Sequence, residues 1–133
     1  MKRVTGIGGI FFKGKNAEQL RLWYREHLGI ESEEYGGFAF KWRDASNPEE
    51  VGQTVWSIFA GHTKYFEPST APFMINYRVT DLPALLDQLR SEGVEVNDKI
   101  DESEYGKFSW IMDPEGNRIE LWEPPNKEEG TKQ

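Results

Sequence analysis

The chain repeats one succession of sequence patterns, and this internal repeat restricts its fold more than any other feature. Residues 8–20 (GGIFFKGKNAEQL) and 73–85 (FMINYRVTDLPAL) each show a strand pattern that leads into a capped helix. Residues 35–44 (YGGFAFKWRD) and 105–113 (YGKFSWIMD) share Tyr, Gly, Phe and a further aromatic residue at matching spacing. Because two copies are too few for a solenoid, we predict a domain built from two similar modules.

The predicted domain covers residues 1–124 and precedes a polar tail at 125–133. Module one covers about 4–61, a connector about 62–72, and module two about 73–124. A chain of 133 residues is long enough to bury one hydrophobic core, so a single domain is expected.

One helix is predicted in each module. The first covers residues 16–29, where Asn16 can cap the start and Gly29 the end. Its helical spacing predicts one buried face made of Leu20, Trp23, Tyr24, His27 and Leu28. The second helix covers residues 81–93 and begins at the cap Asp81. Its predicted apolar stripe consists of Leu82, Leu85, Leu86 and Leu89.

Strand patterns fill the remainder of both modules. The predicted strands are residues 4–15, 38–42, 54–60, 73–79, 106–112 and 117–123. Residues 43–53 are polar and are predicted to form a loop, and the DPEG sequence at 113–116 is a strong turn signal.

Composition excludes several classes of function. The net charge of −7 argues against general binding to nucleic acid or to an anionic membrane. The absence of cysteine excludes disulfides and Cys-based zinc sites. No segment has the apolar length of a signal peptide or a membrane span, so a soluble, cytoplasmic protein is expected.

Glu120 raises the main functional question. It lies between Ile119 and Leu121 in a strand-like run, where a buried carboxylate is costly unless another group pairs with it. The sequence leaves three roles open for this side chain: a solvated residue, half of an ion pair, or a metal ligand.

Three motifs resemble those of the vicinal oxygen chelate superfamily, which includes glyoxalase I, bleomycin-resistance proteins and extradiol dioxygenases. They are WYREHLGI, INYRVTDLPALLDQLRSEGV and DPEGNRIELWEP, and the resemblance covers roughly residues 4 to 124. It implies an α+β fold in which two βαβββ modules form an open, cup-shaped mixed sheet with the helices outside. It also implies a homodimer and a small-molecule ligand.

The same resemblance locates the positions that hold the ion in metal-dependent members. They correspond here to Gly9, Ser57, Met74 and Glu120. Only Glu120 is a competent ligand for the usual divalent ions, because glycine has no ligand atom, a serine hydroxyl is weak and a thioether is soft. The two histidines, His27 and His62, are more simply explained as packed or surface residues. We therefore expect no metal and no other cofactor, with a divalent metal as the alternative.

Strand alternation then predicts which side chains line the cup. The candidate ligand-binding residues are Phe11, Lys13, Phe38, Phe40, Trp42, Ser57, Met74, Asn76, Arg78, Phe108, Trp110 and Trp122. Phe38, Phe40 and Trp42 are assigned by matching the first module to the second. Arg78 is the expected ion-pair partner of Glu120. Because Arg78 and Lys13 are cationic, the expected ligand is a planar or apolar molecule with an acidic or carbonyl group. The alternative is that the aromatic rings only fill the core.

Three classes of function follow. The first is metal-free binding of a small, aromatic or apolar molecule in the cup, and the unsuitable metal positions favour it. The second is a lyase, isomerase or dioxygenase-like enzyme that uses Glu120 as the catalytic general base or as a metal ligand. The third is a structural or partner-binding role, which no feature of the sequence specifically favours.

Overall fold

The computed structural model describes residues 3–33 and 36–125, and these form a single mixed sheet with two helices. In chain order the elements are β1 (Val4–Gly14), α1 (Ala17–Leu28), β2 (Gly37–Asp44), β3 (Asn47–Ala60), β4 (Phe73–Val79), α2 (Leu82–Ser91), β5 (Asp101–Ser103), β6 (Gly106–Met112) and β7 (Arg118–Glu123). Of the described helices, neither is long and apolar enough to cross a membrane.

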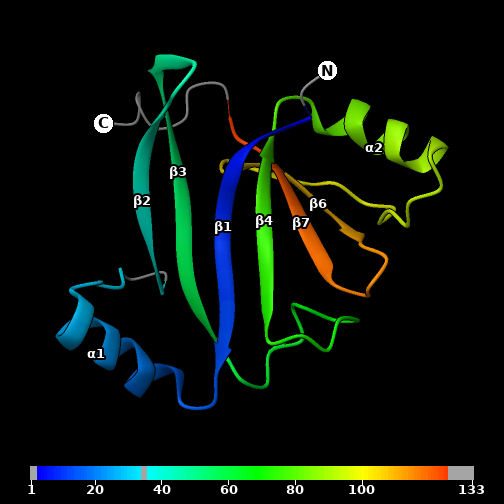
Figure 1. Cartoon of the computed structure of the whole chain (residues 1–133). Coiled ribbons are helices and arrows are strands. Elements are labelled where there is room, and N and C mark those ends of the chain that lie inside the picture. Colours follow the sequence, from blue (N-terminus) through cyan, green and yellow to red (C-terminus); the bar gives the residue numbers. More distant parts are fainter. Residues whose placement is uncertain (1–2, 34–35, 126–133) are drawn as a thin grey trace.

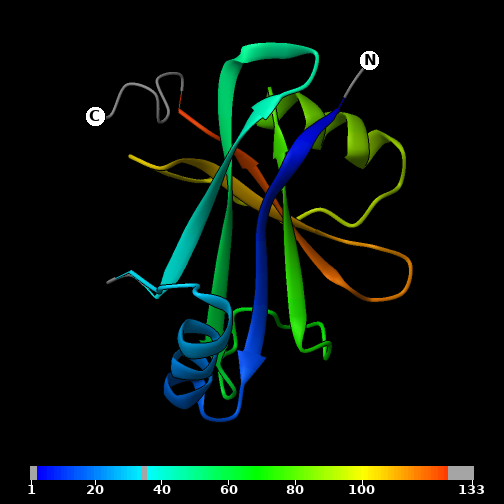
Figure 2. The same ribbon diagram turned by 60° about the vertical axis from the view of Figure 1, so that its left-hand side comes forward.

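The sheet has an approximate two-fold arrangement about its centre. Its seven strands lie in the order β2-β3-β1-β4-β7-β6-β5, with β1 and β4 antiparallel in the middle. On one side β1 is parallel to β3, and on the other β4 is parallel to β7. The sheet is twisted and curved, and β6 passes behind β4 and β7 (Figures 1 and 2). The predicted α+β class and curved mixed sheet are therefore confirmed.

The second module has the predicted βαβββ order, as β4, α2, β5, β6 and β7. In the described part of the first module the order is β1, α1, β2 and β3. The described residues just before β2, 29–33, form no strand that would correspond to β5, and residues 34–35 lie outside the described ranges.

The predicted loop at 43–53 is wrong, because most of it belongs to a long β2–β3 hairpin. The pairing continues from Phe38 opposite Trp56 to Arg43 opposite Val51. The carboxylate of Asp44 accepts hydrogen bonds from both the backbone and the side chain of Ser46, which closes a tight turn. Local turn chemistry therefore allows polar residues to continue both strands.

The helices pack on the outer face of the sheet but bury different amounts of surface. Helix α2 inserts Leu82 and Leu86, which are 0% and 1% exposed, against Val79 of β4 and Leu121 of β7. The predicted buried face of α1 is wrong, because that helix contains no buried residue. Leu28 is 60% exposed, and His27 stacks on Trp23, itself 49% exposed, at the surface. From α1, Tyr24 does pack against Phe12 and Trp56 of the sheet.

The inner face of the sheet carries a separate core. Phe11, Met74 and Trp110 pack there around Phe66, which is 0% exposed and comes from the connector between β3 and β4. Val55, Phe59 and Phe108 pack against this cluster. Side chains of the protein therefore fill part of the concave side. A ligand could occupy only the space that remains on this face.

Candidate functional site

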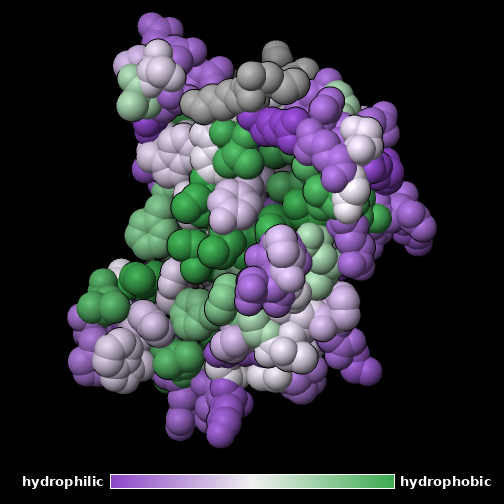
Figure 3. Space-filling model, turned by 45° about the vertical axis from the view of Figure 1, so that its right-hand side comes forward, coloured by the Kyte–Doolittle hydropathy of each residue, from purple (hydrophilic) through white to green (hydrophobic). Residues whose placement is uncertain are grey.

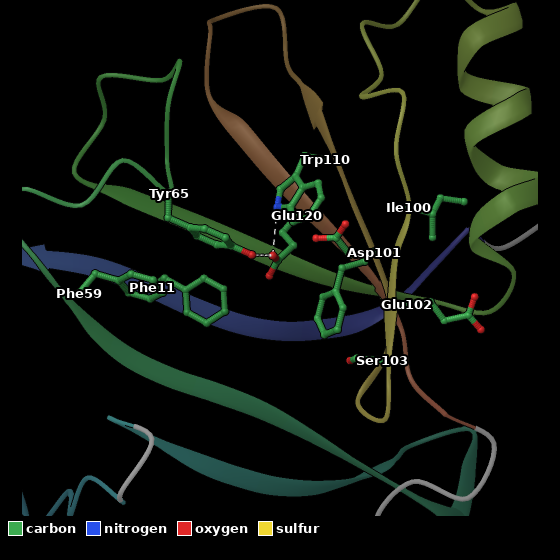
Figure 4. Close-up of a pocket in the computed structure, with 10 residues that line it drawn as sticks. Phe11, Phe59, Tyr65, Ile100, Asp101, Glu102, Ser103, Trp110 and Glu120 are labelled. Atoms are coloured by element: carbon green, nitrogen blue, oxygen red, sulfur yellow. Dashed lines mark hydrogen bonds between the residues drawn. The ribbon is translucent and has the colours of Figure 1, made fainter.

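A cavity of about 610 Å³ remains on the inner face. Its lining consists of Phe11, Phe59, Tyr65, Ile100, Asp101, Glu102, Ser103, Phe108, Trp110 and Glu120. Figure 4 shows these side chains, which come from both halves of the sheet, from the connector and from β5. The walls are mainly aromatic, and the most deeply buried polar group is the carboxyl of Glu120, which is 2% exposed.

Glu120 is held by three neutral hydrogen-bond donors. Asn76 Nδ2 donates to Oε1 at 2.7 Å, and Trp110 Nε1 donates to Oε2 at 3.0 Å. The Tyr65 hydroxyl donates to the same Oε2 (Figure 4). Hydrogen bonds of this kind compensate a buried carboxyl without an ion pair.

Strand pairing positions two of these donors. Trp110 lies directly opposite Glu120 in the β6–β7 hairpin, and Asn76 lies opposite it across the parallel β4–β7 pair. The hairpin is closed by Asp113, whose carboxylate accepts backbone hydrogen bonds from Glu115 and Asn117. The DPEG turn predicted from the sequence therefore sets the register that brings Trp110 to Glu120.

The third donor, Tyr65, reaches the site from the connector. Its backbone carbonyl accepts a hydrogen bond from Arg118, and its ring stacks on Phe59 at 5.7 Å between ring centroids. Tyr65 is not among the site residues predicted from the sequence, because a connector has no periodicity from which side-chain direction can be read. The adjacent aromatic residues Tyr65 and Phe66 in an otherwise polar segment were the available signal.

Burial controls the titration of the site. It raises the pKa of Glu120 above the ordinary value of 4.5, and the hydrogen bonds from Tyr65, Asn76 and Trp110 oppose this rise. The pKa of Tyr65 is also raised, first by burial and then by the negative charge of Glu120. The tyrosine is therefore the donor and the carboxyl the acceptor, and Glu120 is the group placed to exchange a proton.

The four positions that the resemblance assigns to a metal do lie together on the inner face. Phe11 of β1 pairs with both Ser57 and Met74, and Asn76 pairs with both Gly9 and Glu120. The donor set does not fit a metal, however. Met74 is packed in the core, and the Ser57 hydroxyl donates to the Gly36 carbonyl at 3.4 Å. Throughout residues 3–33 and 36–125, no group of three or more His, Cys, Asp or Glu side chains could hold an ion.

Other predicted site residues are divided between the cavity and its surroundings. Phe11, Phe108 and Trp110 line the cavity as predicted. Met74 lies in the core beside it, and Trp122 stacks on Phe108 with ring centroids 5.8 Å apart.

The predicted ion pair between Arg78 and Glu120 is wrong. The guanidinium of Arg78 lies over the rings of Trp42 and Trp122, at 5.3 and 5.1 Å from their centroids. Cation–π contacts of this kind stabilise a guanidinium over the two tryptophan rings. Lys13 likewise lies over the Phe66 ring, at 5.4 Å, and neither cation belongs to the cavity lining.

The prediction that Phe38 and Phe40 line the cup is also wrong. Phe38 lies opposite Trp56, which packs on α1, so its side chain is on the outer face, as is that of Phe40 two residues further along. Their rings contact each other at 4.9 Å. Trp42 lies over Gly52 and donates its indole N–H to Thr54 at 2.8 Å, outside the cavity lining.

A register error explains this misassignment. The sequence match sets Tyr35 against Tyr105, 70 positions apart, and thereby Phe38 against Phe108. In the structure Gly37 lies opposite Ser57, and Trp110 lies opposite Glu120. Gly37 is therefore the counterpart of Trp110, and these two residues are 73 positions apart. The two alignments differ by three positions, and an odd shift turns every side chain of a strand to the other face.

Comparison with known proteins identifies the fold. No family model and no curated protein sequence matches the chain. Among solved structures, the chain is similar to methylmalonyl-CoA epimerase from Mycobacterium tuberculosis, with a TM-score of 0.64 and 20% identity over 96% of this chain and 93% of that one. A methylmalonyl-CoA epimerase in complex with methylmalonyl-CoA and NH4+ gives a TM-score of 0.66 and 17% identity, over 92% of this chain and 96% of that one.

A third similar structure carries the name of the superfamily. It is a glyoxalase/bleomycin resistance protein/dioxygenase superfamily member from Vibrio splendidus, with a TM-score of 0.57 and 10% identity over 88% of this chain and 97% of that one. At these identities the likeness concerns the fold, and it agrees with the curved sheet of two related modules. The chain therefore has the vicinal oxygen chelate fold of the glyoxalase, bleomycin-resistance and dioxygenase proteins.

Proposed function

We propose that this protein binds a small aromatic or apolar molecule in the cavity on its inner face, without a metal ion. The observation that carries the proposal is a cavity of about 610 Å³ with aromatic walls and one buried carboxyl group. Small-molecule sites are typically mostly apolar, with a few fixed polar groups that orient the ligand.

The hydrogen bonds of Glu120 support a binding role without metal. Three protein donors satisfy its two oxygens, so the carboxyl needs no ion to compensate its burial. Ser57 and Met74 at the neighbouring family positions would supply only weak or soft ligands to Zn²⁺, Ni²⁺ or Fe²⁺. The proposed function therefore uses no metal in any step.

Blocking the cavity tests this proposal. Ser103 lines the cavity and Glu104, its neighbour, does not, so Ser103→Trp and Glu104→Trp add the same bulk at adjacent exposed positions. Calorimetric titration with a panel of planar aromatic compounds should detect binding to the wild type and to Glu104→Trp, and none to Ser103→Trp. The proposal fails if no compound binds the wild type, or if Ser103→Trp binds equally well.

The raised pKa of Glu120 supports a second candidate, an enzyme that removes a proton next to a carbonyl group. A carboxyl whose pKa is shifted toward neutrality by burial is suited to proton transfer, and Glu120 borders the cavity. Both methylmalonyl-CoA epimerase structures described above are similar to this chain in fold, and an epimerisation removes and returns a proton.

Solvent deuterium exchange tests this candidate. A benzyl ketone such as phenylacetone, followed by NMR in D₂O, should exchange its α-protons faster with the wild type than with Glu120→Gln. Binding should persist in the variant, because glutamine has nearly the same shape as glutamate and the aromatic walls are unchanged. Exchange at the buffer rate with the wild type would exclude the enzyme and leave the binding function standing.

A further inference from the structure

We propose that the ligand carries a positive charge, and that Asp101 on β5 binds that charge at the mouth of the cavity. This inference rests on the proposed function, since it specifies the class of molecule that the same cavity binds. An aromatic or apolar amine, protonated at neutral pH, is the class that fits.

The charges that line the cavity are all acidic. Asp101, Glu102 and Glu120 belong to the lining, and the described lining contains no Lys, Arg or His. The expectation of an acidic ligand came from Lys13 and Arg78, and both lie over aromatic rings elsewhere. An anionic ligand would therefore meet repulsion from these carboxylates.

Strand geometry distinguishes the two mouth carboxylates. Asp101 lies directly opposite Phe108 across the β5–β6 pair, so the two side chains share the face that borders the cavity. Figure 4 shows the Asp101 side chain directed toward Trp110 and Glu120, whereas Glu102 points away from them. Glu102 lies opposite Lys107 on the other face of that pair. Asp101 is therefore the carboxylate in position to contact a bound molecule.

Asp101 is also available for a ligand. It is exposed, and no side chain within the described residues forms an ion pair or hydrogen bond with its carboxylate. Arg118, the cation on the other side of Trp110, lies over that ring at 4.9 Å and donates to the Tyr65 carbonyl. A ligand ammonium would supply the missing partner of Asp101.

The aromatic walls favour the same class of molecule. Phe11, Phe59, Phe108 and Trp110 offer ring faces and edges in the cavity that Asp101 borders, and Phe108 lies directly opposite Asp101. A cation beside such rings gains from their quadrupoles, and an aromatic body gains from ring stacking. The proposed binding mode places the aromatic body among these rings and the ammonium between Phe108 and Asp101.

Three ligands that share one aromatic group test the inference. They are naphthalen-2-ylmethylammonium, the neutral naphthalen-2-ylmethanol and naphthalene-2-carboxylate, each titrated calorimetrically into the wild type at low salt. We expect the ammonium to bind about tenfold more tightly than the alcohol, and the carboxylate to bind most weakly. Added salt should reduce the advantage of the ammonium.

Variants assign the preference to one side chain. Asp101→Asn should bring the ammonium and alcohol affinities to within about twofold and leave the alcohol affinity unchanged. Glu104→Gln removes the same charge from the next turn, outside the lining, and should retain the wild-type preference.

The possible outcomes separate the two proposals. If none of the three ligands binds, the proposed function fails and the inference fails with it. If the alcohol or the carboxylate binds as tightly as the ammonium, only the inference is overturned. If the preference survives in Asp101→Asn, or is lost equally in Glu104→Gln, the assignment to Asp101 is wrong.

Discussion

Among single residues, Glu120 shows how a buried carboxyl can be stabilised without a cation. The sequence indicates correctly that the strand position is costly, and the structure compensates it with Asn76, Trp110 and Tyr65. Neutral donors lower the cost of burying the charge but leave the pKa raised. The residue therefore retains a proton more readily than an exposed glutamate.

The raised pKa predicts a specific pH dependence of stability. The folded state holds the proton of Glu120 more tightly than the unfolded state does. The stabilising contribution of this protonated side chain to the free energy of unfolding is therefore fully present below pH 4.5, and it is lost as pH rises through the folded pKa. Glutamine cannot titrate, and the Asn76 amide can turn so that Oδ1, which has no hydrogen-bond partner, accepts from it. The free energy of unfolding of the wild type relative to Glu120→Gln should therefore fall between pH 4.5 and neutral pH.

Denaturant unfolding at a series of pH values measures this difference. All other carboxyl groups are common to the two proteins, so their titration cancels in the comparison. Parallel stability curves across the whole range would show that Glu120 has the same pKa in the folded and unfolded states.

Gly8 is a second residue whose identity the site requires. A Cβ atom there would lie 2.3 Å from Asn76 Oδ1 and 2.8 Å from the Trp122 ring. We expect Gly8→Ala to reduce the free energy of unfolding by about 1–3 kcal/mol, because it displaces well-packed side chains. Gly61→Ala is a milder comparison, since its Cβ would approach the Gly14 carbonyl oxygen only to 3.3 Å. Equal stabilities for both variants in denaturant unfolding would contradict the expected clash.

Among the elements, the two helices differ in how deeply they are buried against the sheet, more than their sequence patterns suggest. Both carry the caps predicted from Asn16 and Asp81, whose side chains accept from Gln19 and Ala84. Helical periodicity locates the buried stripe of α2 correctly, because Leu82 and Leu86 reach the sheet. It overestimates burial for α1, which contacts the sheet mainly through Tyr24 and Leu20.

This contrast gives a measurable difference in stability. Leu86→Ala should cost about 2–5 kcal/mol, because the side chain is 1% exposed and its removal leaves a cavity. Leu28→Ala, at a position that is 60% exposed, should change the stability by less than about 1 kcal/mol. Thermal or denaturant unfolding of the two variants compares them, and a large loss in Leu28→Ala would show that α1 is buried in solution.

The strands show which parts of the site can be read from sequence. In β4 the regular alternation correctly places Met74 and Asn76 on the inner face. The prediction fails in the first module because the Tyr-Gly-x-Phe match lies three positions away from the structural register, and an odd shift turns the side chains of a strand to the other face. Tyr65 and Asp101 could not be assigned, since a connector and a three-residue strand give no usable period.

In the whole molecule, the two helices leave the middle of the outer face uncovered. Figure 1 shows α1 and α2 on opposite sides of the central strands, and Figure 3 shows hydrophobic side chains gathered between them. Ile7 and Ile10 of β1 are 43% and 41% exposed, and Phe73 of β4 is 44% exposed. An apolar area of this kind on a sheet with approximate two-fold symmetry suits a second copy of the same chain.

We therefore expect a homodimer that buries this outer face. Ile10 lies beside Ile75 in the β1–β4 pair, at the centre of the molecule, so Ile10→Glu would place a charge within the interface. Sedimentation at several protein concentrations should show a dimer for the wild type and a monomer for Ile10→Glu.

Leu28→Glu is the control, because Leu28 is still more exposed but lies at the far end of α1. A wild type that sediments as a monomer throughout would refute the dimer, and a monomeric Leu28→Glu would move the interface to α1. Ligand binding should survive in the monomeric variant, because the cavity opens on the opposite face of the sheet.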